Sequence, residues 1–213
     1  MMFIESAEPG YAYHVVNIND LQKTLTEGII FDDKKTYESK YVDFHNYFDR
    51  FKPESIPKWV QRKHAIFASL RFREGHSWHS HSALLKIKLE TRRCWVCNEN
   101  LANFIYEPFV LQSIEGFGTI SEYMDVNGET IVGEYWRSSL SYEDNLIRRF
   151  DSKKGYDAEI LVMHPIPPEN LECLYIVSDH QTLEYKKLKE YYKKGNISLE
   201  DQYRRYLQPA SIS

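Results

Sequence analysis

Two polar side chains on apolar segments, Glu159 and His14, are the first candidates for chemistry. Glu159 precedes an apolar run, Ile160 to Met163, which follows Gly155 and is stopped by Pro165. A carboxylate at the start of a buried strand is costly to bury without a partner, so it faces either solvent at a sheet edge or a cleft that uses its charge. His14 lies in an aromatic and β-branched segment, where it is either a satisfied strand residue or a hydrogen-bonding group of a site.

A second set of residues has the chemistry of a metal site. His76, His79 and His81 stand close together, and Cys94 and Cys97 follow. Two imidazoles and two thiolates can form a tetrahedral zinc site. The spacing matches no zinc finger, however, and the residues between the cysteines indicate a strand that points the two thiols in different directions. We therefore predict no metal site, and we place the histidines in a loop near the substrate.

Composition limits the protein class. With 213 residues, 42% hydrophobic and 27% charged, the chain fits one domain over residues 1–213. Its formal charge of -4 argues against nonspecific coating of duplex DNA, although a local groove can still be positive. Three cysteines, no charged-then-apolar leader and no apolar run of about 18 residues predict a cytoplasmic protein that crosses no membrane. The sequence lacks a Gly-x-Ser-x-Gly elbow and a phosphate-binding P-loop.

Period-two alternation and β-branched or aromatic runs predict the strands. They are expected at residues 11–17, 65–70, 83–89, 93–96, 160–163 and 173–177. The last two are separated by a short proline-rich segment, so we expect them to be antiparallel neighbours.

Capping residues and apolar spacing predict the helices. The first begins at Asn19 or Asp20 and is closed by Gly28, because glycine suits the positive φ of a helix end. Further helices are expected at residues 39–51, 56–63, 98–106 with Asn98 as cap, and 129–146 with an interruption at Ser138-Ser139 or Ser141. Residues 182–207 are expected to form a helical tail outside a core of about residues 11–179.

A set of short segments, taken in chain order, resembles the ADP-ribosyltransferase superfamily. They are Tyr13-His14 on the first strand, a short helix ending at Glu27-Gly28, Ala-Ile-Phe-Ala-Ser at 65–69, Ala-Glu-Ile-Leu-Val at 158–162 and Ile-Pro-Pro-Glu-Asn-Leu at 166–171. The pattern looks most like the DarT-type toxins and their relatives. This resemblance implies an α+β fold in which a split, strongly bent β-sheet with flanking helices holds NAD in its crack.

The resemblance also implies the roles of the two residues considered first. His14, with Tyr13 beside it, would bind the adenosine ribose of NAD, because a neutral imidazole hydrogen-bonds sugar hydroxyls. Glu159 would lie beside the nicotinamide ribose and stabilise the positive charge that develops as nicotinamide leaves. The same carboxylate can orient or deprotonate the acceptor.

Further cofactor contacts are implied on and beside the central strand. Phe67 would stack on the nicotinamide, although a phenylalanine at this spacing also suits the core, and Ser69 would bond the ribose or the amide. Arg62, Arg71 and Arg73 flank the strand, and one of them would hold the pyrophosphate by a bidentate contact. We take Arg62 as the candidate.

The implied activity is transfer of ADP-ribose from NAD, a glycosyltransferase reaction, to a macromolecule. The acceptor implied by the resemblance is a nucleic-acid base, while a protein remains open. Tyr135-Trp136-Arg137 and Arg148-Arg149 would contact a single strand, or they belong to ordinary helices. An antitoxin partner and a role in toxin-antitoxin or phage defence are implied as well. The alternative is a non-catalytic module that binds a nucleotide or a protein on the same fold.

Overall fold

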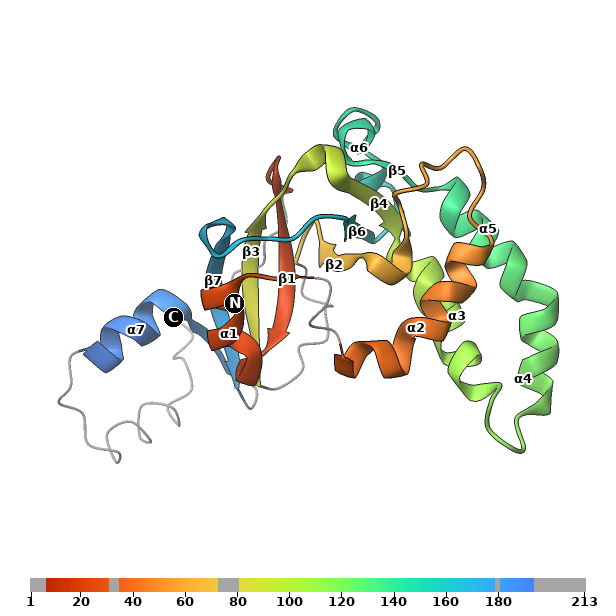
Figure 1. Cartoon of the computed structure of the whole chain (residues 1–213), viewed down its shortest axis with the longest axis horizontal. Helices are drawn as coiled ribbons and strands as arrows, with labels where there is room; N and C mark the ends of the chain where they lie inside the picture. The colour runs from red at the N-terminus through yellow and green to blue at the C-terminus, as the bar shows by residue number, and fades with distance from the viewer. Residues whose placement is uncertain (1–6, 31–34, 73–80, 179–180, 194–213) are drawn as a thin grey trace, which may run out of the picture.

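An antiparallel β-sheet runs through the molecule and is flanked by helices, so the fold is α+β (Figure 1). The computed structural model describes residues 7–30, 35–72, 81–178 and 181–193. Within them the sheet has eight strands in the order β5-β4-β6-β2-β1-β3-β7-β8. The strands are β1 Tyr11–Asn17, β2 Ile66–Ser69, β3 Ser82–Lys88, β4 Cys94–Asn98, β5 Leu140–Ser141, β6 Ala158–Val162, β7 Leu171–Ser178 and β8 Gln181–Glu184.

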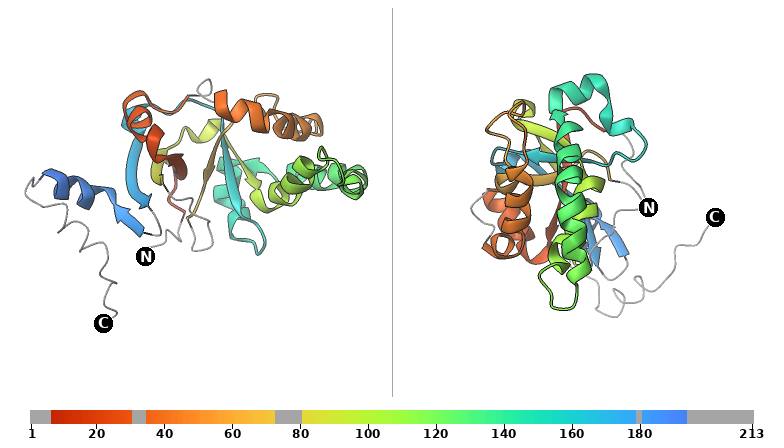
Figure 2. Two further views of the ribbon diagram at one scale, coloured as in Figure 1. Left: turned by 90° about the horizontal axis from the view of Figure 1, so that it is seen from below. Right: turned by 90° about the vertical axis from the view of Figure 1, so that its right-hand side faces the viewer.

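The helices lie in two groups on either side of the sheet. They are α1 Leu21–Glu27, α2 Lys35–Arg50, α3 Glu99–Leu111, α4 Gly118–Tyr123, α5 Glu129–Arg137, α6 Tyr142–Arg148 and α7 Tyr185–Lys193. A single 3-10 turn, η3 Arg62–His64, follows α2, and a π-helical turn at Met124–Gly128 joins α4 to α5. Helices α2 to α5 gather at the end of the molecule opposite α7 (Figures 1 and 2).

The sheet is divided between β1 and β2. These two strands pair only at Tyr13 and Ser69, whereas β1 pairs with β3 along seven residues and β2 with β6 along four. The two central strands diverge on either side of this one residue pair. The backbone and side chains along their facing edges therefore border a common space. The pairing pattern therefore divides the sheet into two halves at this position.

Alternation along β6 separates the two cores. Ile160 and Val162 pack in the cluster that contains Leu21 of α1 and Tyr142 of α6, while Leu161 packs with residues of α2, α3 and α5. Glu159 is two residues before Leu161, so its side chain is directed to the face that α2, α3 and α5 cover.

Local signals predicted the elements well. The strand at 11–17 is confirmed, Gly28 has a φ of 85° at the end of α1, and the side chain of Asn98 accepts the backbone N–H of Asn100 at the start of α3. The side chain of Ser141 likewise caps α6, which divides the helix expected at 129–146. These signals are short-range, so neighbouring residues are enough to fix them.

Three expectations are wrong. Strands β6 and β7 are not neighbours, because β6 pairs with β2 and β4 and β7 pairs with β3 and β8. Residues 182–184 belong to strand β8 and not to a helical tail, and α7 begins only at Tyr185. A helix at 56–63 is replaced by turns and η3, because the Asp49 carboxylate accepts the backbone N–H groups of Arg62 and Lys63. The part of the expected tail beyond residue 193 lies outside the described residues.

Candidate functional site

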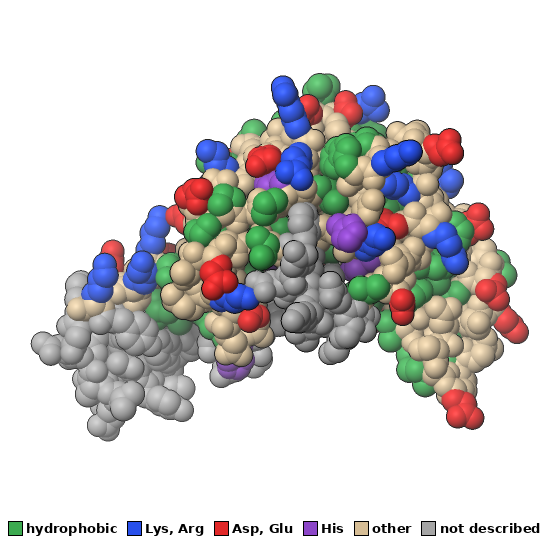
Figure 3. Space-filling view, viewed as in Figure 1, with side chains coloured by type: hydrophobic (Ala, Val, Ile, Leu, Met, Phe, Trp, Pro, Cys, Tyr) green, Lys and Arg blue, Asp and Glu red, His purple; other side chains and the backbone are tan. Residues whose placement is uncertain are grey.

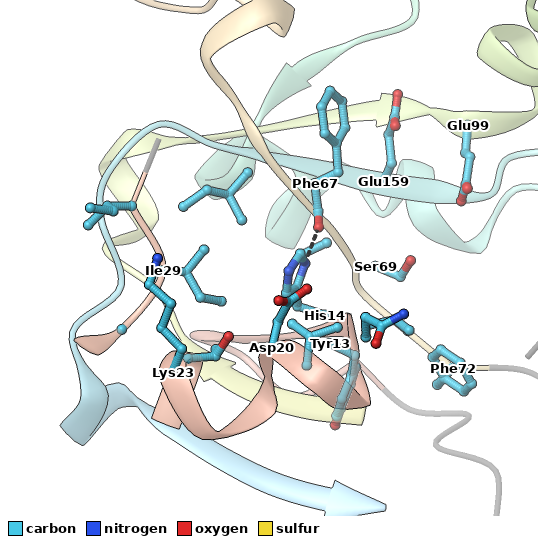
Figure 4. A pocket seen from close by; sticks show the side chains of 18 residues that line it. Tyr13, His14, Asp20, Lys23, Ile29, Phe67, Ser69, Phe72, Glu99 and Glu159 are labelled. Carbon is cyan, nitrogen blue, oxygen red and sulfur yellow. Dashed lines mark hydrogen bonds between the residues drawn. The ribbon is translucent and has the colours of Figure 1, made fainter. Parts of the chain in front are cut away.

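A cavity of about 610 Å³ opens where β1 and β2 diverge. Its volume falls within the range of roughly 300–1,000 Å³ that is usual for small-molecule and cofactor sites. Strands β1 and β2, helix α1 with the residues after it, and the starts of α3 and β6 contribute to its wall. Five of the six predicted site residues line it: Tyr13, His14, Phe67, Ser69 and Glu159 (Figure 4).

His14 is fixed across the split. Its Nδ1 lies 2.6 Å from the carbonyl oxygen of Phe67, on the strand that has parted from β1. A carbonyl oxygen only accepts, so Nδ1 donates, and in the neutral ring Nε2 then carries the lone pair. The half-buried imidazole lies in the wall of the cavity (Figure 4).

The other three residues of the central strands differ in their contacts. Tyr13 is 4% exposed and packs against Phe72 and Leu84, so most of its ring belongs to the core. The ring of Phe67 stacks on His45, with 5.0 Å between centroids, which leaves less of it for a ligand ring. Ser69 is half-buried at the single pairing point of the split and faces the cavity.

Glu159 is buried and fully engaged. Its residue exposure is 5%, and Oε1 accepts hydrogen bonds from the guanidinium of Arg62 and from the hydroxyl of Tyr135, the latter at 2.7 Å. A second guanidinium nitrogen lies 3.4 Å from Oε2. Arginine stays protonated in proteins, so the buried carboxylate has a permanent positive charge beside it.

Arg62 is enclosed by aromatic rings as well as by the carboxylate. Its Cζ lies 4.8 Å from the ring centroids of both Phe48 and Phe67 and 5.0 Å from that of Tyr135. Burial works to lower the pKa of the guanidinium, but the charge of Glu159, the hydrogen bond to it and the contributions of Tyr135 and Cys97 together outweigh burial, so the pKa is raised above the usual value. The rings and η3 thus hold a desolvated cation against Glu159.

The predicted role of Arg62 does not match its position. Arg62 does not line the cavity, and its side chain is 6% exposed. It therefore contacts Glu159 and is not placed to bind a pyrophosphate. Arg71 instead pairs with buried Asp151 at 2.5 Å, and Arg73 lies outside the described residues.

The residues proposed to stack on a single strand are also placed differently. Tyr135 and Trp136 are 0% and 1% exposed, and the indole N–H of Trp136 donates to the Phe48 carbonyl at 2.7 Å. Neither ring is available to a base. Arg137, Arg148 and Arg149 are exposed.

No family model, curated protein or solved structure matches the chain. The case for a function therefore rests on the cavity and its side chains. No helix in the described part of the chain is both long enough and apolar enough to cross a membrane.

The structure also bears on the metal site considered from the sequence. Cys94 and Cys97 are buried in different core clusters on the two faces of β4, as their spacing indicated. Thiols on opposite faces of a strand cannot bind one ion together. No cluster of three or more His, Cys, Asp or Glu in residues 7–30, 35–72, 81–178 and 181–193 could hold a metal, while His76 and His79 fall outside these ranges.

Three charged residues of the cavity were not predicted as site residues. Glu99 is the first residue of α3, Asp20 directly precedes α1, and Lys23 lies on α1. Figure 4 shows Lys23 and Asp20 at one end of the cavity and the two glutamates on the far side of His14, so the charged lining residues are mostly acidic. Glu99 is near Glu159 because β4 pairs with β6 in the register of Cys97 with Glu159, which a single sequence does not reveal.

Proposed function

We propose that the protein is an NAD-dependent ADP-ribosyltransferase that modifies a macromolecular acceptor. The supporting observation is that side chains from three distant parts of the sequence, Tyr13-His14, Phe67-Ser69 and Glu159, line one cavity at the split in the sheet.

The chemistry of the wall suits a dinucleotide with two sugars and a diphosphate. The lone pair on Nε2 of His14 can accept a hydrogen bond from a ribose hydroxyl, and Ser69 offers a hydroxyl that both donates and accepts. Lys23 is the cation among the described residues that line the cavity, and it suits the diphosphate. With the diphosphate near Lys23, the nicotinamide ribose would extend toward Glu159.

Glu159 would act through its charge. When the bond from ribose C1′ to nicotinamide breaks, positive charge develops on the sugar, and a fixed carboxylate beside it lowers the barrier. Arg62 and Tyr135 hold Glu159 in place, so little reorganisation is needed at the moment of reaction.

One observation favours the alternative of a binding module without catalysis. Glu159 is 5% exposed, and Arg62 and Tyr135 already occupy its oxygens. A carboxylate in this state stabilises the fold whether or not a ligand reacts next to it. Binding and cleavage of NAD must therefore be measured separately.

The deciding experiment measures NAD binding by calorimetry and nicotinamide release by chromatography. We expect wild type to release nicotinamide slowly with water as acceptor. Glu159→Gln should bind NAD and lose about 10²–10³-fold in rate, the cost of removing one electrostatic group from an active site. His14→Ala should weaken NAD binding by up to about tenfold, the equivalent of one hydrogen bond. Glu107→Gln, at an exposed position of α3, is the matched control and should behave as wild type.

Binding of NAD without nicotinamide release would favour a nucleotide-binding module, and absence of NAD binding would refute both the transferase and the NAD-binding module, leaving a module that binds another nucleotide or a protein. The acceptor class is identified by adding single-stranded DNA, RNA and a mixture of proteins in separate assays. The additive that stimulates nicotinamide release indicates the class, and mass spectrometry locates the ADP-ribose on it. Lys and Arg are interspersed with Asp and Glu across the face in Figure 3, so a local acceptor site fits this face better than a broad cationic one. An antitoxin would be sought as a protein that suppresses release.

A further inference from the structure

Glu99 is a second carboxyl group in the cavity, with surroundings that contrast with those of Glu159. It begins α3 directly after the cap Asn98, and its backbone N–H donates to the Asp157 carbonyl at 2.8 Å, which fixes the residue beside the start of β6. Its side chain lines the cavity and also a small neighbouring pocket that holds Ser69 and Asp157.

The two carboxyl groups also point in different directions. In Figure 4 the Glu159 side chain extends on the same side as the Phe67 ring, away from His14, whereas the Glu99 carboxyl is directed toward Ser69. Glu159 is bound by Arg62 and Tyr135, while the Glu99 carboxyl has no hydrogen bond or ion pair with the residues that the structure describes. Of the two, Glu99 has oxygens open to a molecule in the cavity.

The charges around Glu99 favour its protonated form. Burial, together with repulsion from Glu159 and Asp157, raises the pKa of Glu99 to about 7, while Arg62 opposes the increase. Arg71 and Asp151 also line the neighbouring pocket, where they form an ion pair with each other. A carboxyl group that gains and loses a proton near neutral pH suits proton transfer.

We propose that Glu99 is the general base of the transfer reaction and that Glu159 stabilises charge without exchanging a proton. This inference rests on the proposed function. Nicotinamide leaves C1′ of the ribose as a neutral pyridine that takes the bonding electron pair, so the leaving group needs no proton. The acceptor, an O–H or N–H group, forms the new bond to C1′ and gives its proton to the Glu99 carboxylate, which passes it to solvent. With water as acceptor, NAD⁺ and water give ADP-ribose, nicotinamide and one proton.

The test compares wild type, Glu99→Gln and Glu107→Gln across pH 5.5 to 8.5. Nicotinamide release by wild type should rise with pH to a plateau with a midpoint near 7, because the base must be unprotonated. Glu99→Gln should lose this pH dependence and about 10²–10⁴-fold in rate, the usual contribution of acid-base catalysis, while its NAD affinity changes by less than about twofold. Glu107→Gln should follow wild type.

A second measurement does not depend on activity. In protein labelled with ¹³C at glutamate carboxyl carbons, one NMR signal should titrate near pH 7 in wild type and be missing in Glu99→Gln. The assignment is overturned if no glutamate titrates there, or if Glu99→Gln keeps the wild-type rate or its pH profile. Wild type that does not cleave NAD would refute the proposed function and this inference with it, whereas unchanged cleavage by Glu99→Gln refutes the inference alone.

Discussion

Replacing Arg62 by methionine should destabilise the protein strongly. The side chains of Arg62 and Glu159 are 6% and 7% exposed, so the variant leaves a buried carboxylate with Tyr135 as its remaining partner. Removing one member of a buried ion pair costs about 3–5 kcal/mol of unfolding free energy, because the other charge stays desolvated. At about 2–4 °C per kcal/mol for a chain of this size, the melting temperature should fall by about 6–20 °C.

The cause can be isolated with a double variant. Unfolding by urea, followed by circular dichroism, gives the free energies of wild type, Arg62→Met, Glu159→Gln and the combination. The combined variant carries no buried charge at this position, so it should be less destabilised than the sum of the single variants by at least about 1 kcal/mol.

Arg137→Met is the matched control. Arg137 pairs with Glu134 on α5, but the two side chains are 62% and 54% exposed, so the loss should stay within about 0.5 kcal/mol. The reasoning fails if Arg62→Met is as stable as this control, or if the effects of Arg62→Met and Glu159→Gln simply add.

Three further changes test other parts of the structure by the same unfolding assay. Gly28→Ala should cost about 2–4 kcal/mol, because φ is 85° and a Cβ would overlap the Ile166 carbonyl oxygen. Gly155→Ala, with φ 76° and open space around it, should cost about 1 kcal/mol. Equal losses in the two variants would contradict the clash at Gly28. Ser141→Ala removes the cap of α6 and should cost about 1 kcal/mol, so an unchanged midpoint would exclude a stabilising cap. The pKa of Glu99 is raised from 4.5 to about 7, so the charged carboxylate costs stability as pH rises through this range. Glu99→Gln should match the unfolding free energy of wild type at pH 4 and exceed it at pH 8 by about 1–2 kcal/mol. This magnitude is the full pKa shift at about 1.4 kcal/mol per pH unit, roughly halved for partial exposure. A constant difference between pH 4 and pH 8 would refute this.

The sequence was most informative where structure depends on adjacent residues. Asn98 and Ser141 were recognised as caps, and Gly28 as a helix end, because each needs only the backbone next to it. His14 and Glu159 were selected by residue type on short strands, and both line the cavity.

Strand order depends on distant residues, and there the prediction failed. The proline-rich segment after β6 suggested a tight connection to β7. Instead it runs extended beside the residues after α1, where Ile29 and Ile166 exchange two backbone hydrogen bonds of 2.8 and 2.9 Å. The segment that contains this bridge connects the two halves of the sheet. Backbone hydrogen bonds of this kind involve no side chains, so no residue pattern predicts them.

The residues that contact Glu159 could not be predicted from the sequence for the same reason. Tyr135 is 24 residues away along the chain and Arg62 is 97 away. Each lies in a segment with an ordinary helical or turn pattern, so neither the buried pair nor the placement of Glu99 could be predicted before β4, β6 and α5 were brought together.

The division of the sheet also has a consequence for folding. One half contains β5, β4, β6 and β2, and the other contains β1, β3, β7 and β8, so the chain passes between halves after β1, β2, β3 and β6. Neither half is a continuous piece of sequence, and both depend on contacts between residues far apart in the chain, which form slowly. The half that contains β1 and β8 spans residues 11–184, and the cavity takes side chains from β1, β2 and β6, so it can arise only late, when strands of both halves are already in place.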